Sequence, residues 1–332
     1  MQDRIAECGR MAIKYGLIQY AEGACSTVAR ARQGSLRAKV LTEYTKAELL
    51  LRKPSAEIDP KTGMKLNTLQ RQFEDFEKRI EALKLLDRAM IANKKLQDSD
   101  VTIEGCILIW NIGIPLLKNS ARIHIYKPFQ AAATALEQLE ANECQLRVCL
   151  HLELAKFEIE QDFLSRASLQ LKKALMIDYS ETTKNLPFEL NENDNPDDFA
   201  RPYDRALKFI LKKLSLKTNL YGGDPDSMHE LIILDVENAK TTKNAKMRET
   251  LLDKAIKQLL EYEEPEFEVR PEDNLVEEEI VAAQKKFHLN LIKERKERVL
   301  IAAEISKLAL EEGLIDISYE AATLCCKEEW DP

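Results

Sequence analysis

Histidine and cysteine, the side chains best suited to metal binding and nucleophilic catalysis, are few in this chain and widely separated. None of the histidines forms the His-Glu-x-x-His spacing of a zinc site, and neither a glycine-rich phosphate loop nor a Gly-x-Ser-x-Gly nucleophile motif occurs. The sequence therefore predicts no catalytic, cofactor-binding or metal site, and we expect that the protein is not an enzyme. We expect His151, on the inner face of a predicted helix, to be structural. The four histidines are His124, His151, His229 and His288.

Seven cysteines form neither a recognisable ligand set nor a disulfide framework. Cys144 and Cys149 are five residues apart, which fits a metal-ligand pair poorly. Cys325 and Cys326 are adjacent, so on a helix they point about 100° apart. The odd number favours free thiols in a reducing compartment. We expect buried or half-buried thiols in apolar helical stretches at Cys8, Cys25, Cys106, Cys149 and Cys325.

Net charge and hydropathy exclude several classes of partner. The 332 residues carry a formal net charge of −8, which opposes binding to nucleic acid and to anionic lipid. No stretch reaches the ~20 apolar residues that span a bilayer, and residues 1–20 lack the apolar core of a signal peptide. We therefore expect neither a nucleic-acid nor a membrane partner. Ala, Leu, Glu and Lys dominate, which is typical of helix throughout.

A repeating stripe of small and aliphatic residues indicates how these helices pack. Two segments repeat the same three residue types at offsets of 0, 4 and 7, which place them on one helix face. They are Ala82, Leu86 and Ala89, and Ala167, Leu171 and Ala174; looser copies are Ala132, Leu136 and Leu139, and Ala255, Leu259 and Tyr262. From Ala132 to Ala167 is 35 residues, close to the ~34-residue tetratricopeptide period. The pattern predicts an all-α, tetratricopeptide-like α-solenoid of stacked antiparallel helix pairs.

The two ends of the chain resemble each other. Ile5–Val28 aligns with Ala302–Cys325, and both segments read as helix, glycine break, helix. Neither end offers the polar outer face that caps a solenoid, so we expect the chain to be a segment of a longer protein, or partners to cover both ends. The shared positions are Ala6 and Ala303, Ala12 and Ala309, Gly16 and Gly313, Leu17 and Leu314, Ile18 and Ile315, and Ala24 and Ala321.

Glycines, prolines and polar clusters divide the chain into three parts. We expect N-terminal tetratricopeptide-like repeats in 1–179, an acidic linker or loop in 180–202, and C-terminal helical repeats that continue the solenoid in 203–332. Pro115 should bend or end its helix. The absence of Gly and Pro from Asn274 to Glu312 predicts one long helix or two stacked end to end. The other expected helices are Asp3–Tyr15, Leu17–Arg32, Leu36–Arg52, Leu69–Leu96, Val101–Lys118, Ala121–Leu139, Glu143–Glu160, Asp162–Ile177, Pro202–Tyr221, Asp226–Ala239, Lys246–Tyr262 and Leu314–Glu329.

Two segments have the composition of partner-binding helices. Gln284–Ile301 is basic and amphipathic, like a calmodulin target. Because Glu294 and Glu297 interrupt its positive charge, we favour a solvated solenoid face. Cys106–Leu117 is apolar nearly all round, which favours a core helix over a partner groove.

The segment Glu81–Asp178 resembles the N-terminal tetratricopeptide region of a family of large cilia- and flagella-associated proteins. The resemblance is carried by EALKLLDRAMIANKKL, EGCILIWNIGIPLLKNSARIHIYKPF and ECQLRVCLHLELAKFEIEQDFLSRASLQLKKAL. Its most specific part is CILIWN at 106–111, followed by PLL at 115–117. The acidic insertion near Asp194 departs from the family pattern.

That family belongs to a projection on the central-pair microtubules of the axoneme. The resemblance implies a structural scaffold in the cytoskeleton of the cilium or flagellum, which holds neighbouring projection proteins and supports motility. The implied partners are other central-pair projection proteins and tubulin, directly or indirectly, and calmodulin is a further candidate for 284–301. The alternative is a soluble tetratricopeptide adaptor that binds peptides in trafficking or chaperone assembly. Residues 9–12 and 155–158 lack the Lys, Asn and Arg set of a carboxylate clamp.

The small-residue stripe makes a prediction about stability. Ala167→Arg should overpack a helix pair and lower the free energy of unfolding by about 1–3 kcal/mol or more. Lys172→Ala, on the other face of the same helix, should change it by less than about 0.5 kcal/mol. Thermal melting followed by circular dichroism measures both, and equal melting temperatures would contradict the assigned face.

Overall fold

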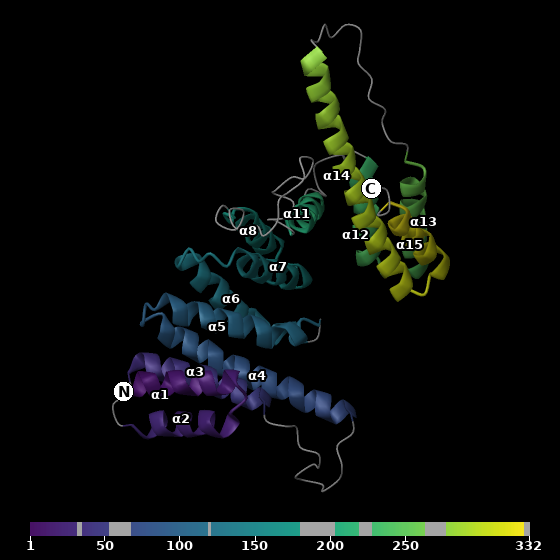
Figure 1. Ribbon diagram of the computed structural model, residues 1–332. Coiled ribbons are helices and arrows are strands. Elements are labelled where there is room, and N and C mark those ends of the chain that lie inside the picture. The colour runs from purple at the N-terminus through teal and green to yellow at the C-terminus, as the bar shows by residue number, and fades with distance from the viewer. Residues whose placement is uncertain are drawn as a thin grey trace. The chain divides into compact units, whose positions relative to one another are not determined.

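The computed structural model describes residues 1–31, 35–52, 68–118, 121–179, 203–218, 228–262 and 277–328. In these ranges the chain is all α-helical, apart from one short 3-10 helix, and contains no strand (Figure 1). The predicted fold class is confirmed. The chain divides into two compact units, Met1–Lys208 and Phe209–Pro332. The predicted linker 180–202 lies outside the described residues.

Consecutive helices make up both units. The first unit contains α1 (Gln2–Lys14), α2 (Ile18–Arg30), α3 (Leu36–Arg52), α4 (Thr68–Asn93), α5 (Ser99–Gly113), η1 (Ile114–Leu116), α6 (Arg122–Gln138), α7 (Cys144–Glu160) and α8 (Leu164–Leu175). Helix α11 (Asp204–Thr218) runs from the first unit into the second. The second unit continues with α12 (Met228–Thr241), α13 (Ala245–Leu260), α14 (Glu277–Glu311) and α15 (Ile315–Glu328).

The helices of the first unit pack in the order expected of a solenoid. Each helix packs against the next one along the chain, from α1 to α8. The first helix of each pair also contacts the first helix of the following pair, as α1 does with α3, α3 with α5, and α5 with α7. In the second unit α12 and α13 form one such pair, and α14 and α15 form the next. The predicted stacking of antiparallel helix pairs is therefore confirmed within each unit.

The small-residue stripe lies in the seams between helices. Ala167, Leu171 and Ala174 of α8 are fully buried, as are Ala82 and Leu86 of α4. A further stripe at the same offsets, which sequence analysis did not detect, lies on α2. It consists of Ala21, Cys25 and Val28 and is also buried. Its central residue is cysteine rather than leucine, and this substitution concealed the repeat.

The connection between the helices of a pair is a three-residue turn that occurs in at least three places. Gly16 and Gly313 have φ values of 76° and 77°, in the left-handed region that glycine adopts without strain. The amide of the next residue, Leu17 or Leu314, donates to a carbonyl oxygen five residues earlier at 2.8 Å, which defines a Schellman cap. Asp162 takes the same conformation, with φ 60°, between α7 and α8. The predicted similarity of the two chain ends thus reflects a shared turn.

Pro115 and the long C-terminal helix also agree with the prediction. Helix α5 ends at Gly113 and continues into the 3-10 helix that contains Pro115. Helix α14 is continuous over 35 residues, so the segment is one helix rather than two.

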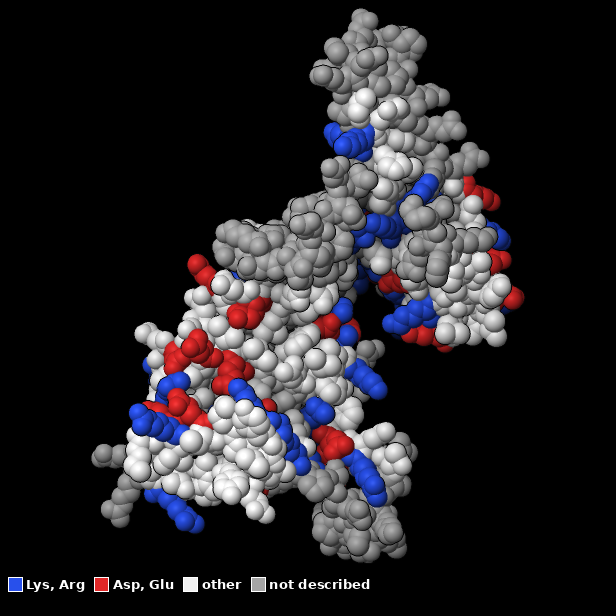
Figure 2. Space-filling view, viewed as in Figure 1, with Lys and Arg blue, Asp and Glu red and all other residues white. Residues whose placement is uncertain are grey.

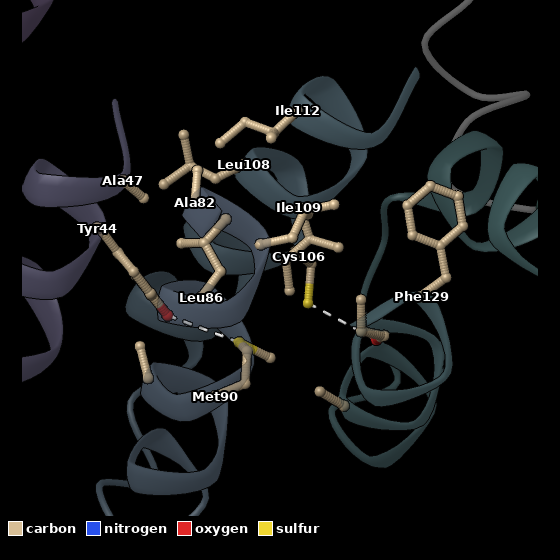
Figure 3. Close-up of a cluster of buried hydrophobic side chains, with 14 of the residues drawn as sticks. Tyr44, Ala47, Ala82, Leu86, Met90, Cys106, Leu108, Ile109, Ile112 and Phe129 are labelled. Atoms are coloured by element: carbon tan, nitrogen blue, oxygen red, sulfur yellow. Dashed lines mark hydrogen bonds between the residues drawn. The ribbon is translucent and has the colours of Figure 1, made fainter. Parts of the chain in front are cut away.

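Helix α5, which carries the most specific part of the resemblance, lies in the core of the first unit (Figure 3). Cys106, Leu108, Ile109 and Ile112 are buried, so the favoured reading of this segment as a core helix is confirmed for most of its length. Ile107 is an exception, because it lies on the open side of α5 and is 40% exposed.

Tyr44 of α3 packs directly on α5, and a glycine makes this possible. The Tyr44 hydroxyl donates to the carbonyl oxygen of Val101 at 3.1 Å, and burial raises its pKa. Opposite it lies Gly105, where an added Cβ would meet the Tyr44 hydroxyl and lie 2.7 Å from Cζ and 2.9 Å from the sulfur of Met90. The backbone of α5 can approach α3 only because residue 105 has no side chain.

Gly105→Ala should therefore destabilise the first unit by about 1–3 kcal/mol, despite the higher helix propensity of alanine. The matched control is Gly23→Ala in α2, where an added Cβ meets nothing within 4 Å. That variant should instead gain about 0.5–1 kcal/mol. Urea unfolding followed by circular dichroism measures both, and a stabilised Gly105→Ala variant would show that this contact is not tight.

Candidate interaction site

A groove with a volume of about 540 Å³ runs across the first helices of three successive pairs, α1, α3 and α5. Its apolar surface includes Ile103 and Ile107 of α5, one turn apart. Charged side chains surround this apolar strip. They are Arg10, Lys14, Glu48, Asp100, Glu104 and Glu143.

Arg10 links the three helices that line the groove. Its side chain is 6% exposed, because α3 and α5 close over α1 at this point. Its Nη1 donates to Glu48 of α3 at 2.5 Å, and its Nε and Nη2 donate to one oxygen of Glu104 of α5, at 3.1 and 2.8 Å. Because this buried guanidinium has charged partners on two other helices, it fixes the positions of three successive helix pairs relative to one another.

The groove is electrostatically suited to a basic ligand. Its lining contains four acidic and two basic side chains, so the net charge is negative even after Arg10 is paired. An acidic peptide would be repelled, whereas a segment with a basic residue beside an apolar one matches both the rim and the exposed Ile107. Over the wider surface in view in Figure 2, acidic and basic side chains are interspersed, and neither sign forms one continuous field.

This groove is not evident from the sequence. Arg10, Glu48 and Glu104 are far apart in the sequence, and each resembles an ordinary charge on an amphipathic helix. Only the pairing of α1 with α3, and of α3 with α5, brings them together. A hint was available in Arg10, because it lies between Gly9 and Ala12 on the face of α1 that carries the small residues.

His151 is a structural residue, as expected. It is 2% exposed, with Nδ1 2.8 Å from Oε1 of Gln170 on α8 and Nε2 3.1 Å from Oε1 of Glu137 on α6. Burial lowers its pKa, while the contacts with Gln170 and Glu137 act in the opposite direction. Lys173 donates to the other oxygen of Glu137 at 3.0 Å. The side chain thus links α6, α7 and α8.

The basic segment 284–301 is only partly the solvated face that the sequence predicts. Lys285 and Lys286 are exposed, but Arg298 is 7% exposed. Its guanidinium lies 4.9 Å from the ring centre of Tyr262, a cation–π contact. Glu297 accepts from Lys212 of α11 at 2.9 Å. The prediction is wrong for the C-terminal part of the segment, because α11 and α13 cover it.

Of the five cysteines expected to be buried or half-buried, Cys25, Cys106, Cys149 and Cys325 are so, and Cys8 is not. Burial raises the pKa of Cys106 to about 12, and it also raises the pKa of Cys25, so neither thiol has the low pKa of a nucleophile. Cys149 is half-buried and its pKa is likewise raised by burial. Cys8, which we expected in a buried stripe, is exposed because no described helix covers that side of α1.

Within the described ranges there is neither a candidate metal cluster nor a candidate membrane span. These residues contain no group of three or more His, Cys, Asp or Glu side chains that could hold a metal ion. None of the helices described is both long and apolar enough to cross a membrane.

Comparison with known proteins shows a similarity to a cilia- and flagella-associated protein. No protein-family model matches the chain. The chain is 30% identical over 186 residues to cilia- and flagella-associated protein 46 of Chlamydomonas reinhardtii. The matched residues are 56% of this chain, and they span 6% of the length of that much longer relative.

The role of Arg10 can be tested by removing its charge. Arg10→Met keeps the aliphatic stem but leaves Glu48 and Glu104 without their cation, and should cost about 1–3 kcal/mol in the free energy of unfolding. Lys14→Met, on the exposed side of the same groove, should change it by less than about 0.5 kcal/mol. Adding Glu48→Gln and Glu104→Gln to Arg10→Met should recover part of the loss. Equal unfolding midpoints for the two single variants would contradict the assigned role.

Proposed function

We propose that this chain is part of a structural scaffold of the cilium or flagellum. The observation that carries the proposal is the 30% identity over 186 residues with a cilia- and flagella-associated protein. The resemblance of CILIWN at 106–111 and PLL at 115–117 to the same class of protein supports it. Because the chain corresponds to a small part of the relative, the role of the whole relative is extended to it only as part of this proposal.

The fold supports a scaffold for a physical reason. Stacked helix pairs bury a continuous core and expose long faces, so a solenoid can bind neighbours without a catalytic centre. Two of the buried polar side chains of the first unit, Arg10 and His151, link successive helices and fix their register. We infer that the protein acts through its shape and surfaces, and that its tetratricopeptide-like pairs hold other proteins in place.

The proposed location is the central pair of the axoneme, with other projection proteins as partners and tubulin contacted directly or through them. Calmodulin fits less well than the amphipathic pattern alone suggests. To wrap around 284–301 it would have to displace the contacts of Arg298 and Glu297. Lys285 and Lys286 remain exposed and accessible to a partner.

A second candidate function is a peptide-binding adaptor. The observation that favours it is the groove of about 540 Å³ across α1, α3 and α5, which has the size of a small ligand site. A scaffold and an adaptor differ in how firmly the protein is bound to the axoneme.

The two are distinguished by extracting cilia that contain the fluorescently tagged protein. A scaffold should stay with axonemes stripped by detergent and leave them only at high salt, together with other projection proteins. Tubulin serves as the marker of the axoneme and an untagged diffusible fluorescent protein as the marker of the soluble fraction. Axonemes from a mutant without the central pair should lose the tagged protein.

Release of the whole protein by detergent alone would favour the adaptor. Retention in axonemes that lack the central pair would support a ciliary scaffold and contradict the central-pair location. Absence of the protein from cilia would overturn the proposal.

A further inference from the structure

The first and last helix pairs, α1–α2 and α14–α15, share one plan, so their surfaces can be compared position by position. Both pairs turn at a left-handed glycine, Gly16 or Gly313, and both close the turn with the same pair of backbone hydrogen bonds. Aligned on these glycines, the residues that correspond are Arg10 and Lys307, Ile13 and Leu310, Ile18 and Ile315, and Cys25 and Ala322.

In the first pair, α3 covers these positions. Leu49 of α3 packs in one apolar cluster with Ile13 and Ile18, and Ile13 is fully buried. Glu48, the preceding residue of α3, accepts from the guanidinium of Arg10 at 2.5 Å. One helix therefore supplies both the apolar and the charged partner of the pair.

In the last pair the corresponding positions are open. Leu310 is 66% exposed and Ile315 is 71% exposed, and Ala322 is exposed as well. The side chain of Lys307 is 76% exposed, and its Nζ lies 4.0 Å from Oε1 of Glu311, an exposed intrahelical pair that is worth little in water. Tyr319, 73% exposed, adds an aromatic ring next to them on α15. We call these five residues the open face; no helix of the described ranges takes the place that α3 takes on the first pair.

The other side of the two pairs shows the reverse arrangement. Ile301 and Ile305 of α14 are buried in a core that α12 and α13 share. Their counterparts on α1 are Arg4 and Cys8, which are exposed. Helix α3 covers one side of α1–α2, and helices α12 and α13 cover the opposite side of α14–α15. The covered side carries apolar residues in both pairs. The open face of α14–α15 differs because it is apolar although no described helix covers it.

We propose that the open face binds an amphipathic helix of another protein in the way that α1–α2 binds α3. The bound helix would place a leucine against Leu310, Ile315 and Ala322, as Leu49 does in the first pair. A glutamate directly before that leucine would pair with Lys307, as Glu48 pairs with Arg10. The chain's own α3 cannot serve, because its Leu49 is 5% exposed within the first unit.

Charge supports a basic helix as the ligand. The residues that follow Leu310, Ile315 and Tyr319 in the sequence are Glu311, Asp316 and Glu320, all acidic and exposed. Helix α3 itself carries four basic and two acidic side chains, so its sequence has the complementary net charge. Tyrosine is a typical anchor of an interface, and Leu310 and Ile315 add exposed apolar surface of the kind that marks an interaction site.

The probe is a fluorescein-labelled peptide of the α3 sequence, LRAKVLTEYTKAELLLR, titrated with the full chain and followed by fluorescence anisotropy. We expect binding that Leu310→Asp weakens about tenfold or more, as for a central anchor residue. The matched control is Leu169→Asp on α8, where leucine is 54% exposed outside the open face, and binding should change by less than about twofold. Circular dichroism verifies that both variants keep their helix content.

A charge swap tests the assigned orientation. Lys307→Glu should weaken binding of the native peptide, and a peptide with Glu48→Lys should bind that variant better than it binds the native chain. A merely structural effect of Lys307 would not produce this reversal.

Three outcomes would overturn the proposal. In the first, the peptide fails to bind. In the second, it binds the Leu310→Asp variant as tightly as the native chain, which would mean that the peptide replaces the chain's own α3 in the first unit. Alternatively, light scattering shows a dimer that Leu310→Asp dissociates, and the occupant is then a second copy. The proposal rests on the fold alone, so these results are independent of whether the protein is ciliary.

Discussion

The close approach of neighbouring helices is the constraint on which the rest of this structure depends. Where Ala167 and Ala174 face the adjacent helix, and where Gly105 faces Tyr44, the backbones can come together only because these side chains are small or absent. Leu171 and its counterparts fill the space between. The result is a core that continues from one helix pair to the next, because each repeat stacks on the one before it.

Much of this arrangement is predictable from the sequence because it is local. Helical periodicity located the helices, and the alanine stripe identified the buried face of α8. The breaks between helices were predicted at all three turns, and glycine marks two of them, Gly16 and Gly313. The left-handed conformation of Asp162 was not predicted, since aspartate adopts it far less readily than glycine does.

The candidate site was beyond sequence reasoning for a different reason. The partners of Arg10 come from α3 and α5, and the ring under Arg298 comes from the end of α13. These side chains meet because particular helices stack on one another, and a single sequence does not show directly which helices stack. Sequence analysis treated Arg298 as solvated because its neighbours Glu294 and Glu297 resemble a surface pattern. Burying a charge in this way is tolerable only where a partner compensates for its lost hydration.

The length of α14 has a mechanical consequence. It contains 35 residues and is about 52 Å long, whereas its hairpin partner α15 contains 14 and is about 21 Å long. The first part of α14 therefore extends about 30 Å past the end of α15. Such a helix acts as a lever: a rotation of about 10° at its packed base moves its tip by about 5 Å. A small change in how the base of α14 packs is thus magnified at its tip.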